Sequence, residues 1–98
     1  MRLEDMPQLR GGDKIQIYID DKNSPFESPI SAEYLRIYNP LLKLPDPQFG
    51  NLANPTLIFQ PTREYLERTG QGIFSLLNMN PIDSIALRAI EKIEKVLE

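Results

Sequence analysis

The chain has 98 residues, of which 41% are hydrophobic and 26% are charged, so it is long enough for one small globular domain, residues 1–98, and too apolar for a disordered protein. Its formal net charge of −3 makes nucleic acid an unfavourable partner, because polyanion binding normally needs a basic surface. The absence of histidine and cysteine removes the usual general base at neutral pH, the commonest metal ligand and the thiolate nucleophile, so we expect no enzymatic activity, no cofactor and no metal site.

Neither a membrane span nor a secretory signal is expected. No apolar run approaches the ~18 residues that would cross a bilayer, and residues 1–5 lack the apolar core of a signal peptide. A chain without cysteine is compatible with the reducing cytoplasm. The sequence therefore predicts a cytoplasmic protein without membrane contact.

Two strands are predicted in the first part of the chain. Residues 14–20 alternate strictly, with Ile15, Ile17 and Ile19 on one face. Residues 21–25 are rich in turn formers, so the chain is expected to reverse there. Residues 33–39 alternate as well, although the segment that precedes them also resembles a first helical turn, and we favour a strand that forms an antiparallel hairpin with the first. On its outer face Tyr18 would then lie across from Tyr34 or Tyr38.

Residues 40–55, which we call the arm, fit neither a helix nor a strand. Prolines in this stretch remove hydrogen-bond donors and favour extended geometry in the residues before them. A long irregular segment is often functional, and this one is too apolar for a solvated loop. Pre-ordering by proline lowers the entropy cost of binding. The sequence predicts that the arm, together with Tyr34 and Tyr38, binds a protein partner or a second copy, with packing of the arm on its own domain as the alternative. The predicted contact residues are Leu41, Leu42, Leu44, Phe49, Leu52, Tyr34 and Tyr38.

A third strand and a short helix are predicted next. Residues 56–60 form an apolar run bounded by prolines, as in a buried strand. Thr62 is a candidate N-cap for a helix over residues 63–69, and Gly70 a candidate C′ residue with positive φ. The apolar run at residues 73–77 fits either a strand or a helix.

An amphipathic helix is predicted over residues 81–97. Asn80 and Pro81 form a helix-start signal, and apolar residues recur with helical spacing from Ile82 to Ile93. Glu91 and Lys95 form a favourable i, i+4 pair on the polar side. We expect this helix to cover the sheet, with helix pairing between subunits as the alternative.

The remaining candidate sites have ordinary structural explanations. Asp21 and Asn23 begin like a calcium loop, but the central glycine and distal glutamate of an EF-hand are missing, so a solvated turn is favoured. The glycine-bearing turns at residues 11–12 and 70–72 lack the strand, helix and lysine of a phosphate-binding loop.

Local resemblances do not identify a family. Residues 17–21 and 31–40 are similar to a segment of the small domains found at the N-terminus of gamma-butyrobetaine hydroxylases, but the chain lacks that family's later strands and zinc ligands. Residues 12–17 are similar to strand starts in many small barrels, including domains of phage-tail hub proteins.

The sequence thus predicts an α+β fold, in which a small, mainly antiparallel sheet is covered by the C-terminal helix and carries the arm between its second and third strands. The predicted function is that of a non-enzymatic protein-interaction or assembly subunit. A nucleic-acid-associated regulator using Tyr34, Arg36 and Tyr38 is the alternative, and a carboxylate-based hydrolase accessory domain is a third possibility.

Overall fold

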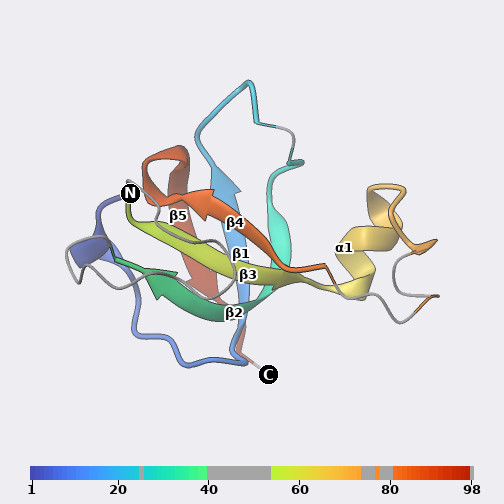
Figure 1. Ribbon diagram of the computed structural model, residues 1–98, viewed down its shortest axis with the longest axis horizontal. Helices are drawn as coiled ribbons and strands as arrows, with labels where there is room; N and C mark the ends of the chain where they lie inside the picture. The colour runs from blue at the N-terminus through green and yellow to red at the C-terminus, as the bar shows by residue number, and fades with distance from the viewer. Residues whose placement is uncertain (25, 40–53, 74–76, 78–80, 98) are drawn as a thin grey trace.

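The computed structural model describes residues 1–24, 26–39, 54–73, 77 and 81–97 (Figure 1). A 3-10 helix, η1 (Leu3–Asp5), precedes the strands β1 (Lys14–Ile19), β2 (Ile30–Tyr38) and β3 (Thr56–Pro61). The short helix α1 (Arg63–Arg68) follows, and then β4 (Asp83–Ala86), the 3-10 helix η3 (Leu87–Ala89) and β5 (Ile90–Lys95). Most of the regular secondary structure in the described part of the chain is therefore strand, and its one α-helix is short.

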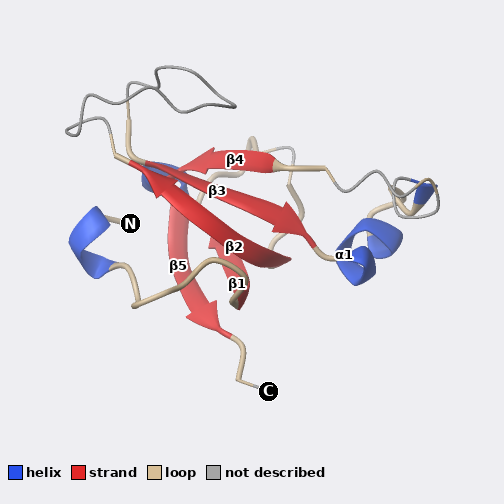
Figure 2. Cartoon of the chain, turned by 60° about the horizontal axis from the view of Figure 1, so that its bottom comes forward, coloured by secondary structure: helices blue, strands red, loops and turns tan. Residues whose placement is uncertain are grey.

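The five strands form one sheet in the order β4-β3-β2-β1-β5, and every neighbouring pair is antiparallel. The two edge strands β4 and β5 are consecutive in the chain and are joined only by η3, so the sheet must curl to bring its edges together at that end. β5 accordingly runs at a steep angle to β3 and β4 (Figure 2).

The concave side of the curled sheet holds the core cluster. Alternation along the strands turns Ile15, Ile17, Leu57 and Phe59 to this side, and removing each such side chain from water contributes about 1.5–3 kcal/mol. The other buried members of the cluster are Ile30, Ala32, Tyr65, Ile85, Leu87, Ile90 and Ile93. Every strand contributes at least one residue, so the sheet and its core form together.

The N-terminal segment closes part of this core. Met1, Leu3, Met6 and Leu9 are partly buried and pack against the cluster. The Met1 ammonium group donates hydrogen bonds to the carbonyl oxygens of Leu87, at 3.1 Å, and Ile90, at 2.8 Å. The start of the chain is thereby held at the junction between η3 and β5.

The predicted strands and the short helix are found close to their predicted positions. β2 begins at Ile30, three residues before the predicted start, and β3 ends at Pro61. The predicted neighbour of Tyr18 is wrong: β1 and β2 pair Ile17 with Ile30, while Tyr18 lies beside Lys92 of β5.

The predicted α+β fold with a C-terminal helix over residues 81–97 is wrong, because this segment forms β4, η3 and β5. The apolar spacing that resembled a helix has another cause. A register shift between β1 and β5 pairs Tyr18 with Lys92 and Ile19 with Ile90, which leaves Glu91 as an extra residue. Ile90 and Ile93 therefore both face the core although they are three residues apart. Among the described residues, no helix is long and apolar enough to cross a membrane.

Candidate functional site

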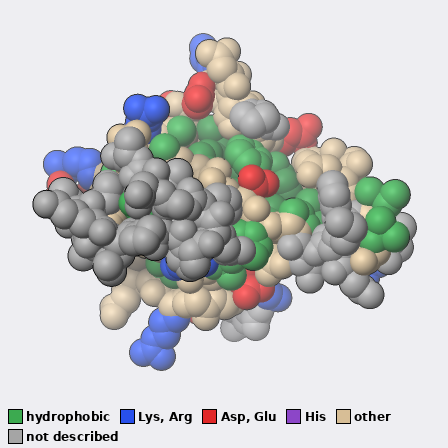
Figure 3. Space-filling model, viewed as in Figure 1, with side chains coloured by type: hydrophobic (Ala, Val, Ile, Leu, Met, Phe, Trp, Pro, Cys, Tyr) green, Lys and Arg blue, Asp and Glu red, His purple; other side chains and the backbone are tan. Residues whose placement is uncertain are grey.

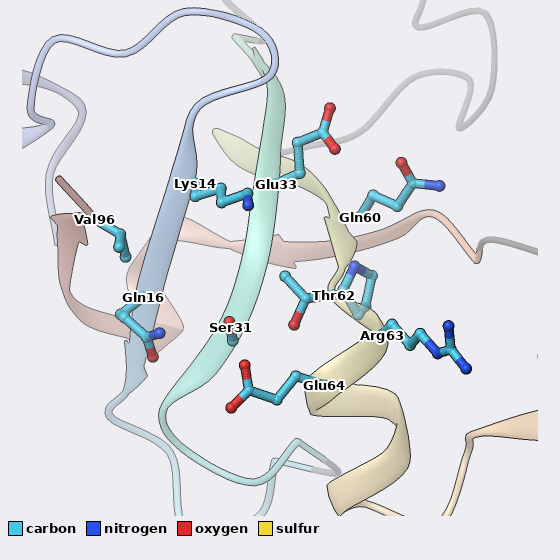
Figure 4. Close-up of a pocket in the computed structure, with 10 residues that line it drawn as sticks. Lys14, Gln16, Ser31, Glu33, Gln60, Thr62, Arg63, Glu64 and Val96 are labelled. Carbon is cyan, nitrogen blue, oxygen red and sulfur yellow. The ribbon is translucent and has the colours of Figure 1, made fainter. Parts of the chain in front are cut away.

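A shallow polar groove of 530 Å³ runs across the outer face of β1, β2 and β3, on the side opposite the core cluster (Figure 4). It ends at the first turn of α1. The residues that line it are Lys14, Gln16, Ser31, Glu33, Gln60, Pro61, Thr62, Arg63, Glu64 and Val96. We call this surface the polar groove.

The strand register fixes the floor of the polar groove. Lys14 is paired with Glu33, and Glu33 is paired with Gln60, so these three residues form one row across three strands. Gln16 and Ser31 form the next row. Directly opposed side chains lie within contact distance, so each row presents adjacent polar groups.

The start of α1 forms one wall of the polar groove. The Thr62 N–H donates to the Ser31 carbonyl at 3.0 Å, which holds the helix start beside β2. The Thr62 hydroxyl accepts a hydrogen bond from the Tyr65 N–H at 3.2 Å, so Thr62 is the N-cap that the sequence predicts. Gly70 after the helix has φ of 80°, also as predicted.

The charges around the polar groove alternate in sign, with Lys14 and Arg63 set among Glu33 and Glu64. Sites for small molecules are usually enclosed, whereas this surface is open, and most of the side chains that line it are polar or charged. Figure 3 shows charged side chains of both signs on one face of the molecule, and among the described residues seen there neither sign forms a large patch.

Four described side chains outside the polar groove have a pKa that is shifted from its ordinary value. The backbone N–H of Arg10 donates to Asp13 Oδ2 at 2.9 Å and, with Lys95 at 3.5 Å, holds the pKa of this carboxyl below its ordinary value. Burial raises the pKa of Tyr34 and Tyr65. The hydrogen bond to Glu94 raises the pKa of Lys92.

The predicted partner-binding residues are only partly visible in the structure. Leu41, Leu42, Leu44, Phe49 and Leu52 lie outside the described residues, so their role as contacts stays a prediction. What the structure does fix is where the arm is attached: Tyr38, just before it, is paired with Thr56, just after it. The arm therefore leaves and returns at one end of the β2-β3 hairpin, opposite the end that carries the polar groove.

Tyr34 and Tyr38 lie on opposite faces of β2. A register shift between Tyr34 and Arg36 pairs Tyr34 with Phe59 and Arg36 with Ile58, so the alternation changes phase between them. Tyr34 packs against the core cluster, whereas Tyr38 is only 8% exposed and shares its face with Arg36. The structure does not bring the two tyrosines together, and their contact with a protein or nucleic acid stays a prediction.

Two surfaces were missed from the sequence for different reasons. The polar groove could have been found, because Lys14 and Gln16 alternate with buried isoleucines and Ser31 and Glu33 alternate with Ile30 and Ala32. The outer edge of β5 could not have been found, since that segment was interpreted as a helix.

Among the described residues, no group of three or more acidic side chains is placed to hold a metal ion. No protein-family model matches the chain, and neither a curated protein nor a solved structure matches it at a significant level.

Proposed function

We propose that this chain is a non-enzymatic protein-interaction or assembly subunit that works in the cytoplasm and binds a protein partner through its arm. The observation that supports this proposal most directly is the attachment of the arm at the paired residues Tyr38 and Thr56. Both ends of a proline-rich apolar segment are thereby attached at one point on the sheet. Fixing both ends limits the conformations that binding must order, which lowers the entropy cost.

The chemistry of the arm fits a protein partner. Its leucines and Phe49 can fill apolar pockets, and its four prolines remove four of its sixteen backbone donors. Truncating a central apolar contact typically costs ~2 kcal/mol or more of binding energy, or about 30-fold in affinity. A small number of arm residues is therefore enough to carry the interaction.

The test is affinity capture from cells of the source organism with quantitative mass spectrometry. The wild-type protein is compared with Leu41→Ser, Leu42→Ser and Leu44→Ser combined, with Phe49→Ala, and with the polar-groove control Arg63→Ala. We expect one set of proteins to be captured by the wild type and the control and to fall at least about 10-fold with both arm variants.

Circular dichroism and thermal melting must first establish that all variants are folded. Equal capture of the same proteins by the wild type and both folded arm variants would refute binding through the arm. Loss of capture with Arg63→Ala alone would instead indicate the polar groove as the binding surface.

A further inference from the structure

Main-chain groups on the outer edge of β5 point away from the sheet. β5 is the last strand in the sheet order, next to β1 only. The Val96 N–H donates to the Lys14 carbonyl at 2.9 Å, and the direction of hydrogen bonding alternates along an antiparallel strand. The N–H and C=O groups of Ile93 and Lys95 therefore point away from β1. Within the described parts of the chain, no strand pairs with that edge.

The side chains of β5 have a charge order that is complementary to itself. Ile93 lies between Lys92 and Glu94, and the next positions outward are Glu91 and Lys95. When an antiparallel copy is centred on Ile93, each lysine faces a glutamate and each glutamate faces a lysine. Opposite charges placed directly across two strands stabilise their pairing, and like charges destabilise it.

Two-fold registers centred on the charged residues of β5 oppose like charges. A pairing centred on Glu91, or on Glu94, sets two carboxylates directly against each other. A pairing centred on Lys92, or on Lys95, sets two ammonium groups against each other. Charged residues on edge strands commonly prevent strand-to-strand association. Here the same charges permit the register centred on Ile93. In that register the outward-pointing N–H and C=O groups of Ile93 can form hydrogen bonds with those of a second copy.

We propose that β5 pairs antiparallel with β5 of a second copy of this chain, centred on Ile93, so that the two five-stranded sheets become one. The N–H of Ile93 donates a hydrogen bond to the C=O of the partner's Ile93, and the C=O of Ile93 accepts one from the N–H of the partner's Ile93. Lys92 faces the partner's Glu94, and Lys95 faces the partner's Glu91. This interface lies at the edge of the sheet and does not depend on the arm.

The side chains that would meet the partner are accessible. Those of Lys92 and Glu94 are 54% and 52% exposed and form an ion pair at 3.0 Å within the chain. Lys92 also lies over the Tyr18 ring, 4.6 Å from its centroid. A second copy places one further opposite charge beside each of these side chains, and no unpaired charge is buried.

The pairing is confined to a short stretch. The Ile90 carbonyl is already bound by the Met1 ammonium at 2.8 Å, and Glu91 is the extra residue of the register shift. So short a strand pair buries much less than the ~1,600 Å² of a standard stable interface. We therefore expect a weak dimer, with a Kd between about 10 µM and about 1 mM.

Sedimentation velocity from about 10 µM to about 2 mM, a range chosen to bracket this Kd, tests the proposal. Wild-type protein is expected to shift towards a dimer as its concentration rises. K92E and E94K alone should each remain monomeric, because each sets like charges at the two central contacts. The double variant K92E/E94K should dimerise like the wild type, since the exchanged charges are again complementary.

An equimolar mixture of K92E and E94K gives the sharpest result. In a mixed pair each glutamate faces a lysine, so we expect a heterodimer from two chains that do not self-associate. The arm variant with Leu41→Ser, Leu42→Ser and Leu44→Ser is the matched control and should dimerise normally. A wild-type protein that stays monomeric throughout, or charge variants that dimerise like the wild type, would overturn the proposal. Dimerisation lost only in the arm variant would place self-association on the arm.

Disulfide trapping tests the register itself. The chain has no cysteine, so introduced thiols are the only ones present. In this register Lys92 and the partner's Glu94 form a non-hydrogen-bonded pair, whose Cα atoms are about 4.5 Å apart, within the range that suits a disulfide. Mixing K92C and E94C chains under mild oxidation should give a mixed disulfide dimer, while either chain alone should crosslink at least about 10-fold more slowly. Equal crosslinking in all three samples would contradict the register centred on Ile93.

Discussion

Asp13 stabilises the turn before β1 in its charged form. Its carboxylate accepts a hydrogen bond from the Arg10 N–H and lies 3.5 Å from Lys95 of β5. The adjoining main chain extends the sheet, because the Tyr34 N–H donates to the Asp13 carbonyl at 2.8 Å. One residue thus links the N-terminal segment, β2 and β5.

The pH dependence of stability should reveal this contact. The pKa of Asp13 is lowered from its ordinary value of 3.8, first by the Arg10 hydrogen bond and then by Lys95. A lowered pKa in the folded state means that the stabilisation is present above the unfolded pKa and is lost as the pH falls through the folded pKa. Urea unfolding of the wild type and Asp13→Asn should therefore show the wild type to be more stable at about pH 6, with the difference shrinking below about pH 3.5. A difference that is constant, or that grows in acid, would show that the charge of Asp13 is not the cause.

At the scale of elements, the register shift in β5 determines which side chains enter the core. Glu91 is the extra residue, and it lets both Ile90 and Ile93 face inward. Because side chains alternate along a strand, removing one residue turns every side chain on one side of the deletion to the other face.

Deleting Glu91 should accordingly expose either Ile90 or Ile93. Each is almost fully buried, so the expected loss is about 1.5–3 kcal/mol of unfolding free energy, to which a poorly packed site adds further cost. Urea denaturation measures the loss. Deletion of Asn23, in the exposed turn between β1 and β2, is the matched control and should change stability by less than about 0.5 kcal/mol. Similar effects of the two deletions would mean that the register shift does not set the orientation of β5.

Elements with local signals were predictable, and those that depend on distant pairing were not. The Thr62 cap, the Gly70 turn and the alternation in β1 are each encoded within a few residues. The C-terminal segment carries helix-like spacing, and only its pairing with β1 and β3 produces strands. Its isoleucines also favour a strand, since β-branched side chains pack well on a sheet. At the candidate site, the polar groove follows from the hairpin register, whereas the separation of Tyr34 from Tyr38 depends on a register shift that no local pattern indicates.

At the scale of the whole molecule, strand order sets the distribution of local stability. β3, β2 and β1 are flanked by strands on both sides, whereas β4 is a four-residue strand at the edge. Edge strands open more easily because fewer hydrogen bonds and apolar contacts must be broken.

Native-state hydrogen exchange followed by NMR should reflect this order. The slowest-exchanging amides are expected in β1, β2 and β3, with protection approaching that of global unfolding, while the amides of β4 should exchange at least about 10-fold faster. Dimerisation adds a concentration dependence: protection of the Ile93 and Lys95 amides should rise with protein concentration, and that of β4 should not. Uniform protection across the five strands would contradict the expected hierarchy.

Because β1 pairs with β5, β1 gains its second neighbouring strand only after β5 has been synthesised. β1 is made before its second neighbour, residues 90–95, and until these have left the ribosome one edge of β1 lacks its strand. A nascent chain thus exposes both that edge and the isoleucines that β5 helps to cover, which are features that molecular chaperones bind and that favour aggregation. Slowing translation through residues 90–95 would therefore lengthen the time for which the edge of β1 and these isoleucines are exposed.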